Sequence, residues 1–178
     1  MKLKKTIPYY EPRKNLSEQV EKSSSRRKMS KFNFLIKKIK NHILETISFN
    51  CPVNSWRIKF NRWRGVHIGE NVFIGLHCTL DHAYPEYIYI EDDVALAGDV
   101  HIIAHSNPYL HFKNVLPSYV ERVSIGKGCW IGIGAIILPG VTIGNYSIIT
   151  ASSVVNKNIP DKVAARGNPA RIISRIIL

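Results

Sequence analysis

The chain has 178 residues, of which 45% are hydrophobic and 21% are charged. This composition excludes an intrinsically disordered protein, and because no run of about 18 apolar residues occurs, no transmembrane helix is expected. The 25 Lys and Arg residues against 13 Asp and Glu residues give a formal charge of +12. Such a charge alone would point to a nucleic-acid-binding protein.

The positive charge is confined to the first third of the chain. Residues 1–64 contain 17 basic and 4 acidic side chains, a net charge of +13, whereas residues 65–178 have a net charge of −1. No nucleic-acid-binding motif accompanies the basic residues, so we predict no nucleic-acid partner. The asymmetry predicts two parts: a basic leader with a helix in residues 1–64 and a separate domain in residues 65–178.

The leader divides into a polar segment and an amphipathic helix. Residues 1–31 are basic and rich in serine, which predicts an exposed or flexible segment. From Phe32 to Ile47 apolar residues recur at helical spacing with lysines on the other faces, which predicts a helix. Two interpretations of this helix stay open: it packs against the end of the domain, or it contacts an anionic membrane.

From Val66 the pattern changes to a six-residue repeat of aliphatic side chains. This period is neither helical nor a simple strand alternation, so it predicts short strands joined by tight corners, three strands to a coil. Two insertions, around residues 84–87 and at residues 106–122, interrupt the repeat. Twelve aliphatic positions predict an all-β solenoid of about four coils: Ile68, Ile74, Leu80, Ile90, Leu96, Ile102, Ile125, Ile131, Ile137, Ile143, Ile149 and Val155.

Small residues occupy two recurring places in the repeat. Glycine often follows the aliphatic residue, as at Gly75 and Gly132, and there we expect it to adopt corner conformations that a Cβ disfavours. Cys78 and Cys129 occupy a small inward position, which predicts packing residues rather than reactive thiols. The three cysteines are widely spaced and form no CxxC pair, which argues against disulfides and suits a reducing cytoplasm.

The repeat, the insertion that follows His105 and the motifs at residues 129–132, 138–144 and 164–171 resemble the hexapeptide-repeat acyltransferases. The resemblance covers about residues 60–175 and is nearest to the sugar O-acetyltransferases of the galactoside, maltose and nodulation-factor type. It implies a left-handed parallel β-helix, here with an N-terminal amphipathic helix and a C-terminal tail. It also implies acetyl-CoA as co-substrate and homotrimers with active sites in the clefts between subunits.

The family's catalytic histidine lies at the start of the long insertion, where this chain has His105. An acetyl thioester is already activated, so a neutral imidazole that deprotonates the acceptor hydroxyl is sufficient as the base. Asp81 follows the strand expected beneath His105; it either orients the imidazole or binds the acceptor, and we favour binding. Asp99 and Glu121 are the competing partners for His105.

The resemblance also assigns binding residues. His77 stands where the family usually has an Asn that contacts the acceptor, so His77 and Asp81 are predicted to bind substrate. Trp130 offers an apolar face, and Lys157 and Arg171 suit the nucleotide phosphates by charge. The predicted coenzyme A contacts are Trp130, Gly132, Ile133, Ala151, Asn156, Lys157 and Arg171.

These observations predict an acetyl-CoA-dependent O-acetyltransferase that acts on a hydroxyl of a sugar or surface-glycan precursor. We expect it in the cytoplasm, with peripheral contact with the inner face of an anionic membrane, and we expect no metal. A serine or drug hydroxyl and an amino-sugar amine remain alternative acceptors. A protein like the γ-carbonic anhydrases is disfavoured, because His77 and His82 have the spacing of a ligand pair but the only earlier histidine two coils away is His42.

Overall fold

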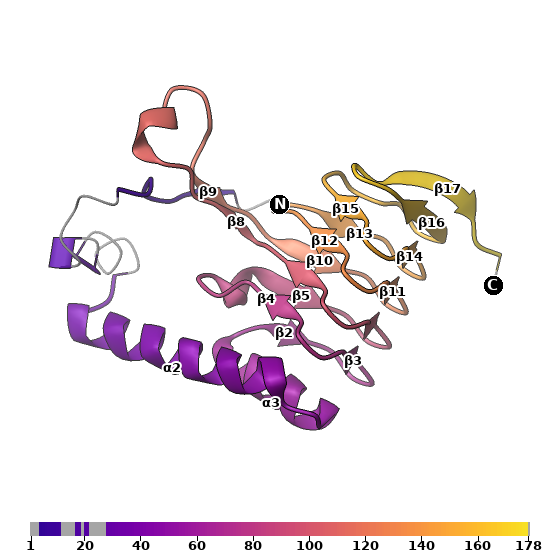
Figure 1. Ribbon diagram of the computed structural model, residues 1–178, viewed down its shortest axis with the longest axis horizontal. Helices are drawn as coiled ribbons and strands as arrows, with labels where there is room; N and C mark the ends of the chain where they lie inside the picture. The colour runs from indigo at the N-terminus through magenta and orange to yellow at the C-terminus, as the bar shows by residue number, and fades with distance from the viewer. Residues whose placement is uncertain (1–3, 12–16, 19, 22–27, 178) are drawn as a thin grey trace.

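Twelve short strands wind into a three-sided parallel coil in the computed structural model, which describes residues 4–11, 17–18, 20–21 and 28–177 (Figure 1). The first sheet consists of β2 (His67–Ile68), β5 (Ile88–Ile90), β10 (Val123–Ile125) and β13 (Thr142–Ile143). The second contains β3 (Phe73–Ile74), β6 (Ala95–Leu96), β11 (Trp130–Ile131) and β14 (Ile148–Ile149). The third contains β4 (Thr79–Leu80), β7 (His101–Ile102), β12 (Ile136–Ile137) and β15 (Val154–Val155).

The aliphatic ladder fills the interior of this coil. Its members pair in register between successive coils, as Leu80 does with Ile102 and Ile102 with Ile137. Eleven of the twelve predicted positions are buried, and Ile68 is partly buried. The four-coil solenoid predicted from the repeat is therefore confirmed, with the core contained in the space that the three sheets enclose.

The two cysteines of the repeat lie where the pattern placed them. Cys78 and Cys129 are buried free thiols in the core cluster. Burial raises the pKa of each to about 11, because a thiolate is poorly solvated there. Both groups therefore stay protonated near neutral pH and act as packing residues, as the sequence predicted.

The repeat glycines have a different role from the one expected. Gly75 and Gly132 do not adopt a positive φ; instead, a Cβ at either position would lie 2.5 Å from backbone atoms of the next coil. Non-glycine residues such as His77 and Asp99 adopt the left-handed corner conformation, each with φ of 57°. The glycines therefore permit the close stacking of coils, and the prediction of a conformational role was wrong for them.

Two helices cover the start of the coil. The predicted amphipathic helix is α2 (Lys31–Asn50), whose first turn is capped by the Ser30 hydroxyl accepting from the Asn33 N–H at 3.2 Å. A second helix, α3 (Asn54–Arg64), was not predicted; it ends at Gly65 in the left-handed conformation that commonly closes a helix. Within the part of the chain that is described, neither helix has the length and apolarity needed to cross a bilayer.

The first residues of the leader are part of the folded structure. The second insertion forms a hairpin of β8 (His105–Ser106), the short 3-10 helix η2 (Leu110–Phe112) and β9 (Tyr119–Val120), and β1 (Lys5–Thr6) pairs antiparallel with β9. Ile7 is buried in the core, and its N–H donates to the Ser118 carbonyl at 3.1 Å. The expectation of an exposed leader is therefore wrong at Ile7, whereas Lys4, Lys5, Thr6 and Tyr10 are exposed as expected. Residues 12–16, 19 and 22–27 of the leader lie outside the described residues.

Smaller elements complete the fold at the two insertions and the C-terminus. The first insertion contains the 3-10 helix η1 (Pro85–Tyr87). After the fourth coil, β16 (Val163–Arg166) extends the second sheet in parallel, and β17 (Arg171–Arg175) folds back antiparallel to it. The predicted C-terminal tail is thus a hairpin that covers the last coil, at the end opposite to the helices (Figure 1).

Candidate active site

The candidate site lies at one corner of the solenoid, which we call the insertion edge: the residues that connect the third sheet to the first. Both insertions leave the coil there, after β4 and after β7. Asp81 directly follows β4, and His105 lies at the start of the hairpin that follows β7. Because β4 and β7 are paired neighbours, two residues 24 positions apart in sequence meet at this edge.

Asp81 and His105 form a short hydrogen-bonded pair. His105 Nδ1 lies 2.6 Å from Asp81 Oδ2, and the side chain of Asp81 has no solvent exposure. A carboxylate only accepts hydrogen bonds, so it assigns the imidazole proton to Nδ1 and leaves a lone pair on Nε2. This tautomer is the one a general base requires, and the side chain of His105 is still 16% exposed.

Backbone groups fix the Asp81 carboxylate. The N–H groups of Ala83 and Tyr84 donate to Oδ1, both at 2.9 Å, and the N–H of Ala104 donates to Oδ2 at 2.7 Å. Burial raises the pKa of Asp81, but the hydrogen bond from His105, the charge of His105 and the backbone N–H groups outweigh it and hold this pKa below its ordinary value. Asp81 is therefore an anion wherever the protein is folded near neutral pH.

The predicted contact between Asp81 and the substrate is corrected by this geometry. A side chain with no exposed surface, whose two oxygens already accept four hydrogen bonds, has no position left for a sugar hydroxyl. The alternative role, orienting the imidazole, fits the observed contacts. Asp99 is not the partner of His105, because its carboxylate faces His77, with Oδ1 3.6 Å from Nδ1. The Glu121 carboxylate instead approaches the backbone at Gly140.

Further residues complete the surroundings of His105. The ring of Tyr84 lies 5.4 Å from the imidazole, and that of His82 lies 5.5 Å from it, both measured between centroids. Below them, buried Arg64 of α3 donates from Nη2 to the Asp81 carbonyl at 3.0 Å and pairs with Glu45 of α2 at 3.4 Å. The sequence placed His82 beside the first insertion and Tyr84 within it, whereas no sequence pattern pointed to Arg64 or Glu45.

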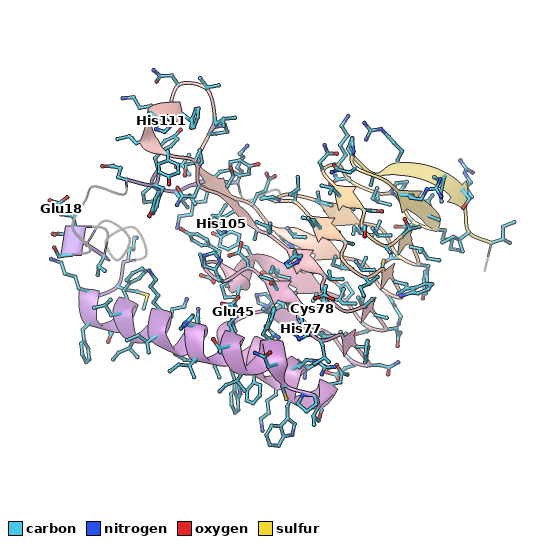
Figure 2. The ribbon with its side chains drawn as sticks, viewed as in Figure 1. Glu18, Glu45, His77, Cys78, His105 and His111 are labelled. Carbon is cyan, nitrogen blue, oxygen red and sulfur yellow. The ribbon has the colours of Figure 1, made fainter. Side chains whose placement is uncertain are left out.

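His77 lies on a different corner of the solenoid, which we call the smooth edge: the residues that connect the second sheet to the third, without insertions. It is half-exposed and stacks against Phe49 of α2 at 5.0 Å between ring centroids. The width of the third sheet separates it from His105 (Figure 2). A single subunit therefore does not bring His77, a predicted acceptor contact, and His105, the predicted base, into one site.

The predicted coenzyme A contacts fall mainly beside the smooth edge. Ile133 and Ala151 are exposed on successive corners there, joined by a 2.8 Å hydrogen bond from the Ser152 N–H to the Ile133 carbonyl. Trp130 lies on the outer face of the second sheet and is 56% exposed. These three side chains are apolar and exposed.

The other predicted coenzyme A contacts differ in burial and in their place on the coil. Gly132 is buried. Its N–H donates to the Ile149 carbonyl at 2.7 Å, and its carbonyl accepts from the Ala135 N–H. Both backbone groups are therefore already used, which argues against the predicted direct contact with coenzyme A. Asn156 and Lys157 are exposed on the insertion edge, after β15. Arg171 is exposed at the start of β17. The two cations thus lie at the C-terminal end of the coil, away from Asp81.

The metal-binding alternative has no support from the arrangement of the histidines. His77 lies on the smooth edge and His82 on the insertion edge, so the proposed ligand pair does not converge within the subunit. Across the described ranges, no group of three His, Cys, Asp or Glu side chains is placed to hold a metal ion.

Comparisons with known proteins identify relatives of this chain. The family described as bacterial transferase hexapeptide (six repeats) matches residues 122–157. The galactoside O-acetyltransferase of Escherichia coli K12 is 35% identical over 127 residues, which make up 69% of this chain and 62% of that protein. WcaF of the same organism, named provisionally as a colanic acid biosynthesis acetyltransferase, is 33% identical over 134 residues, covering 66% of this chain and 74% of WcaF.

Solved structures show the same fold. A maltose O-acetyltransferase from Clostridium difficile 630 matches with a TM-score of 0.64 and 28% identity, over 81% of this chain and 88% of that chain. A galactoside acetyltransferase in complex with coenzyme A has a TM-score of 0.60 at 24% identity, over 79% and 81% of the two chains. The solenoid is accordingly a left-handed parallel β-helix. The chain belongs to the hexapeptide-repeat acetyltransferases.

Proposed function

We propose that the protein transfers the acetyl group of acetyl-CoA to a hydroxyl of a sugar or surface-glycan precursor, with His105 as the general base. The observation that carries this proposal is the Asp81–His105 pair, in which the carboxylate holds a partly buried imidazole in the tautomer that a base requires. The chain spans 62% of the E. coli galactoside enzyme, so the activity is proposed for this chain from its own site as well as from its relatives.

The reaction proceeds by direct attack. His105 Nε2 accepts the proton of the acceptor hydroxyl as its oxygen attacks the thioester carbonyl, and the imidazolium that forms is stabilised by the buried Asp81 carboxylate. The tetrahedral intermediate then collapses, the carbon–sulfur bond breaks, and the proton returns from Nε2 to the departing thiolate of coenzyme A. The products are an O-acetyl ester and free coenzyme A, and the histidine ends in its starting state.

Exposed residues of the chain match the parts of acetyl-CoA. Trp130, Ile133 and Ala151 provide apolar surface for the pantetheine arm, and Lys157 and Arg171 provide cations for the nucleotide phosphates. An acetyltransferase of the same fold has been solved with coenzyme A bound. Acetyl-CoA is made and used in the cytoplasm, so we place the enzyme there.

The acceptor is best described as a neutral hydroxyl compound. The long insertion contains few cations. The guanidinium of Arg122 at its end lies 3.6 Å from the centre of the Tyr89 ring, and its Nε donates a hydrogen bond to the Ser124 hydroxyl. It is therefore not positioned to bind an acceptor carboxylate, as a serine acceptor would require. Tyr84 beside His105 supplies an aromatic face of the kind on which sugar rings pack.

The test is the release of free coenzyme A from acetyl-CoA in the presence of single acceptors: galactosides, maltose, glycolipids, serine, amino sugars and hydroxylated drugs. We expect release with a sugar hydroxyl acceptor that exceeds the rate with serine and with water. A preference for serine, a drug hydroxyl or an amine would contradict the sugar assignment, and no release with any acceptor would contradict acetyl transfer itself.

We further propose that the enzyme works as a homotrimer whose sites lie between subunits. The predicted base is on the insertion edge, whereas His77, Ile133 and Ala151 are on the smooth edge of the same subunit. A ring in which the insertion edge of one subunit faces the smooth edge of the next brings the two groups together three times. The site of each subunit is thereby completed by a neighbouring copy.

Mixing two inactive variants tests this arrangement. His105→Ala removes the base on the insertion edge, and Ala151→Tyr fills the exposed corner on the smooth edge; each homotrimer is expected to be inactive. In randomly mixed trimers about one cleft in four pairs an intact His105 with an intact Ala151, so about a quarter of the wild-type rate should return. If refolded mixtures stay inactive although both variants exchange subunits, the shared site is excluded.

A further inference from the structure

The helix α2 is attached to the β-helix by a largely polar side. Its buried residues are Phe34, Asn41 and Ser48, and the Ser48 hydroxyl accepts from Nδ2 of Asn61 in α3 at 2.7 Å. The carboxylate of Glu45 pairs with buried Arg64 at 3.4 Å. A surface helix normally buries its apolar stripe, so this orientation is the reverse of the usual one.

The apolar stripe of α2 consequently faces away from the protein. Its residues recur at intervals of three and four over a helix about 30 Å long, and their exposed fractions run from 38% at Leu35 to 71% at Phe32. Figure 2 shows side chains extending from α2 on the side away from the β-helix. The stripe consists of Phe32, Leu35, Ile36, Ile39, Ile43 and Ile47.

The neighbouring helix α3 continues this surface with aromatic residues. Trp56 and Trp63 are 58% and 52% exposed, and both rings contact Phe60 edge-on between them. The opposite side of α3 is buried through Arg57, which donates to the Ile74 carbonyl at 2.6 Å. We call the stripe of α2 together with Trp56, Phe60 and Trp63 the helical base. Exposed apolar side chains gathered in this number on two contacting helices mark an interaction site.

The charges around the helical base identify its partner. From Lys31 to Arg64 there are eight basic residues and one acid, and that acid, Glu45, is paired with Arg64. Lys38, Lys40 and Lys59 are exposed on the two helices. Two copies that met through this surface would bring like charges together, whereas an anionic lipid surface offers both hydrocarbon and negative charge.

We propose that the helical base inserts into the interface of an anionic lipid bilayer. The helix α2 then lies in the membrane plane with its isoleucines in the acyl region, and Trp56 and Trp63 take the headgroup level that tryptophan favours. The rest of the enzyme stays above the membrane, with the hairpin of the long insertion at its far side (Figure 1). This proposal does not depend on acetyl transfer.

A chain of polar contacts joins the helical base to Asp81 and His105 on the insertion edge. Glu45 of α2 pairs with Arg64, Arg64 donates to the Asp81 carbonyl at 3.0 Å, and Asp81 holds His105 at 2.6 Å. Docking of α2 would therefore set the orientation of His105 relative to the membrane. Variants that test membrane binding should leave Glu45 and Arg64 unchanged, so that this connection is kept.

Flotation of the full-length protein with vesicles tests the proposal. Wild type should float with vesicles of phosphatidylcholine containing phosphatidylglycerol, less with phosphatidylcholine alone, and less as the salt concentration rises. The double variant Ile39→Glu/Ile43→Glu should lower the partition coefficient at least about tenfold, since it places two anions in the inserted stripe. Both positions are more than half exposed, so the fold should be retained.

A matched control is available at the other end of the β-helix. Ile172→Glu/Ile173→Glu makes the same chemical change on β17 at side chains of similar exposure, 52% and 53%, and should float like wild type. Coenzyme A release with a water-soluble acceptor, measured on the same samples, separates membrane binding from catalysis. Equal flotation of the α2 variant and wild type, or no flotation of wild type, would overturn the proposal. So would a smaller oligomer for the α2 variant in sedimentation, which would identify a second copy as the partner.

Discussion

His105→Ala is expected to lower kcat for acetyl transfer by about 10²- to 10⁴-fold, the usual contribution of a positioned general base. The KM for acetyl-CoA should change little, because the residues proposed to bind the cofactor lie in other parts of the coil. The fold should be retained, since the side chain of His105 lies at the surface of the insertion edge and the ladder beneath it is unchanged. Steady-state rates and the melting temperature measure the two effects.

His111→Ala is the matched control for this variant. His111 belongs to the same hairpin but lies at its far end, next to Phe112, whereas His105 lies at the base (Figure 2). The control should keep most of the wild-type kcat. A His105→Ala enzyme that retained the wild-type rate, or a His111→Ala enzyme that lost it, would remove His105 from the role of base.

Asp81→Asn is expected to have the second largest effect. An amide at this position donates to Nδ1 of His105 and moves the imidazole proton to Nε2, where it blocks the base, so kcat should fall by about 10²- to 10⁴-fold. The amide N–H₂ that replaces one oxygen would also face a backbone donor, and an unsatisfied buried group costs about 1–3 kcal/mol of stability. Glu121→Gln, which changes a carboxylate that lies beside Gly140, should leave most of the activity.

The same variant has an expected signature in acid. The pKa of Asp81 is lowered in the folded protein, so its carboxylate stabilises the fold fully above the ordinary aspartate pKa of about 3.9. This contribution is lost as the pH falls through the lower, folded-state pKa. Stability measured by urea unfolding should therefore decline more steeply below about pH 4 in wild type than in Asp81→Asn. Equal slopes would show that folding does not lower the pKa of Asp81.

The solenoid could be predicted because its repeat acts in every coil. Each aliphatic residue sits at the same place in a short strand, so a period of six implies parallel stacking, and the stacking placed Asp81 beneath the strand that leads to His105. The role of Asp81 was harder to predict. Its burial depends on how the first insertion folds over it, with Ala83 and Tyr84 donating to its carboxylate, and an insertion has no repeat from which to infer this.

The packing of the two helices could not be predicted from the spacing of their apolar residues. The spacing in α2 indicated two unlike faces, but not which face packs, because that depends on the partner surface. The partner, α3, buries Arg57, Asn61 and Arg64 and exposes Trp56 and Trp63, the reverse of the usual pattern, which is why it was not predicted. The strand β1 spans two residues, which is too short for any periodic signal.

The most direct test of the proposed reaction is the mass of a sugar acceptor after incubation with acetyl-CoA and enzyme. With wild type we expect an acceptor that gains one acetyl group and a protein that carries none. With His105→Ala we expect an unchanged acceptor over the same time. A wild-type enzyme that leaves every sugar acceptor unchanged while it hydrolyses acetyl-CoA, or that carries a covalent acetyl group in turnover, would contradict direct transfer with His105 as the base.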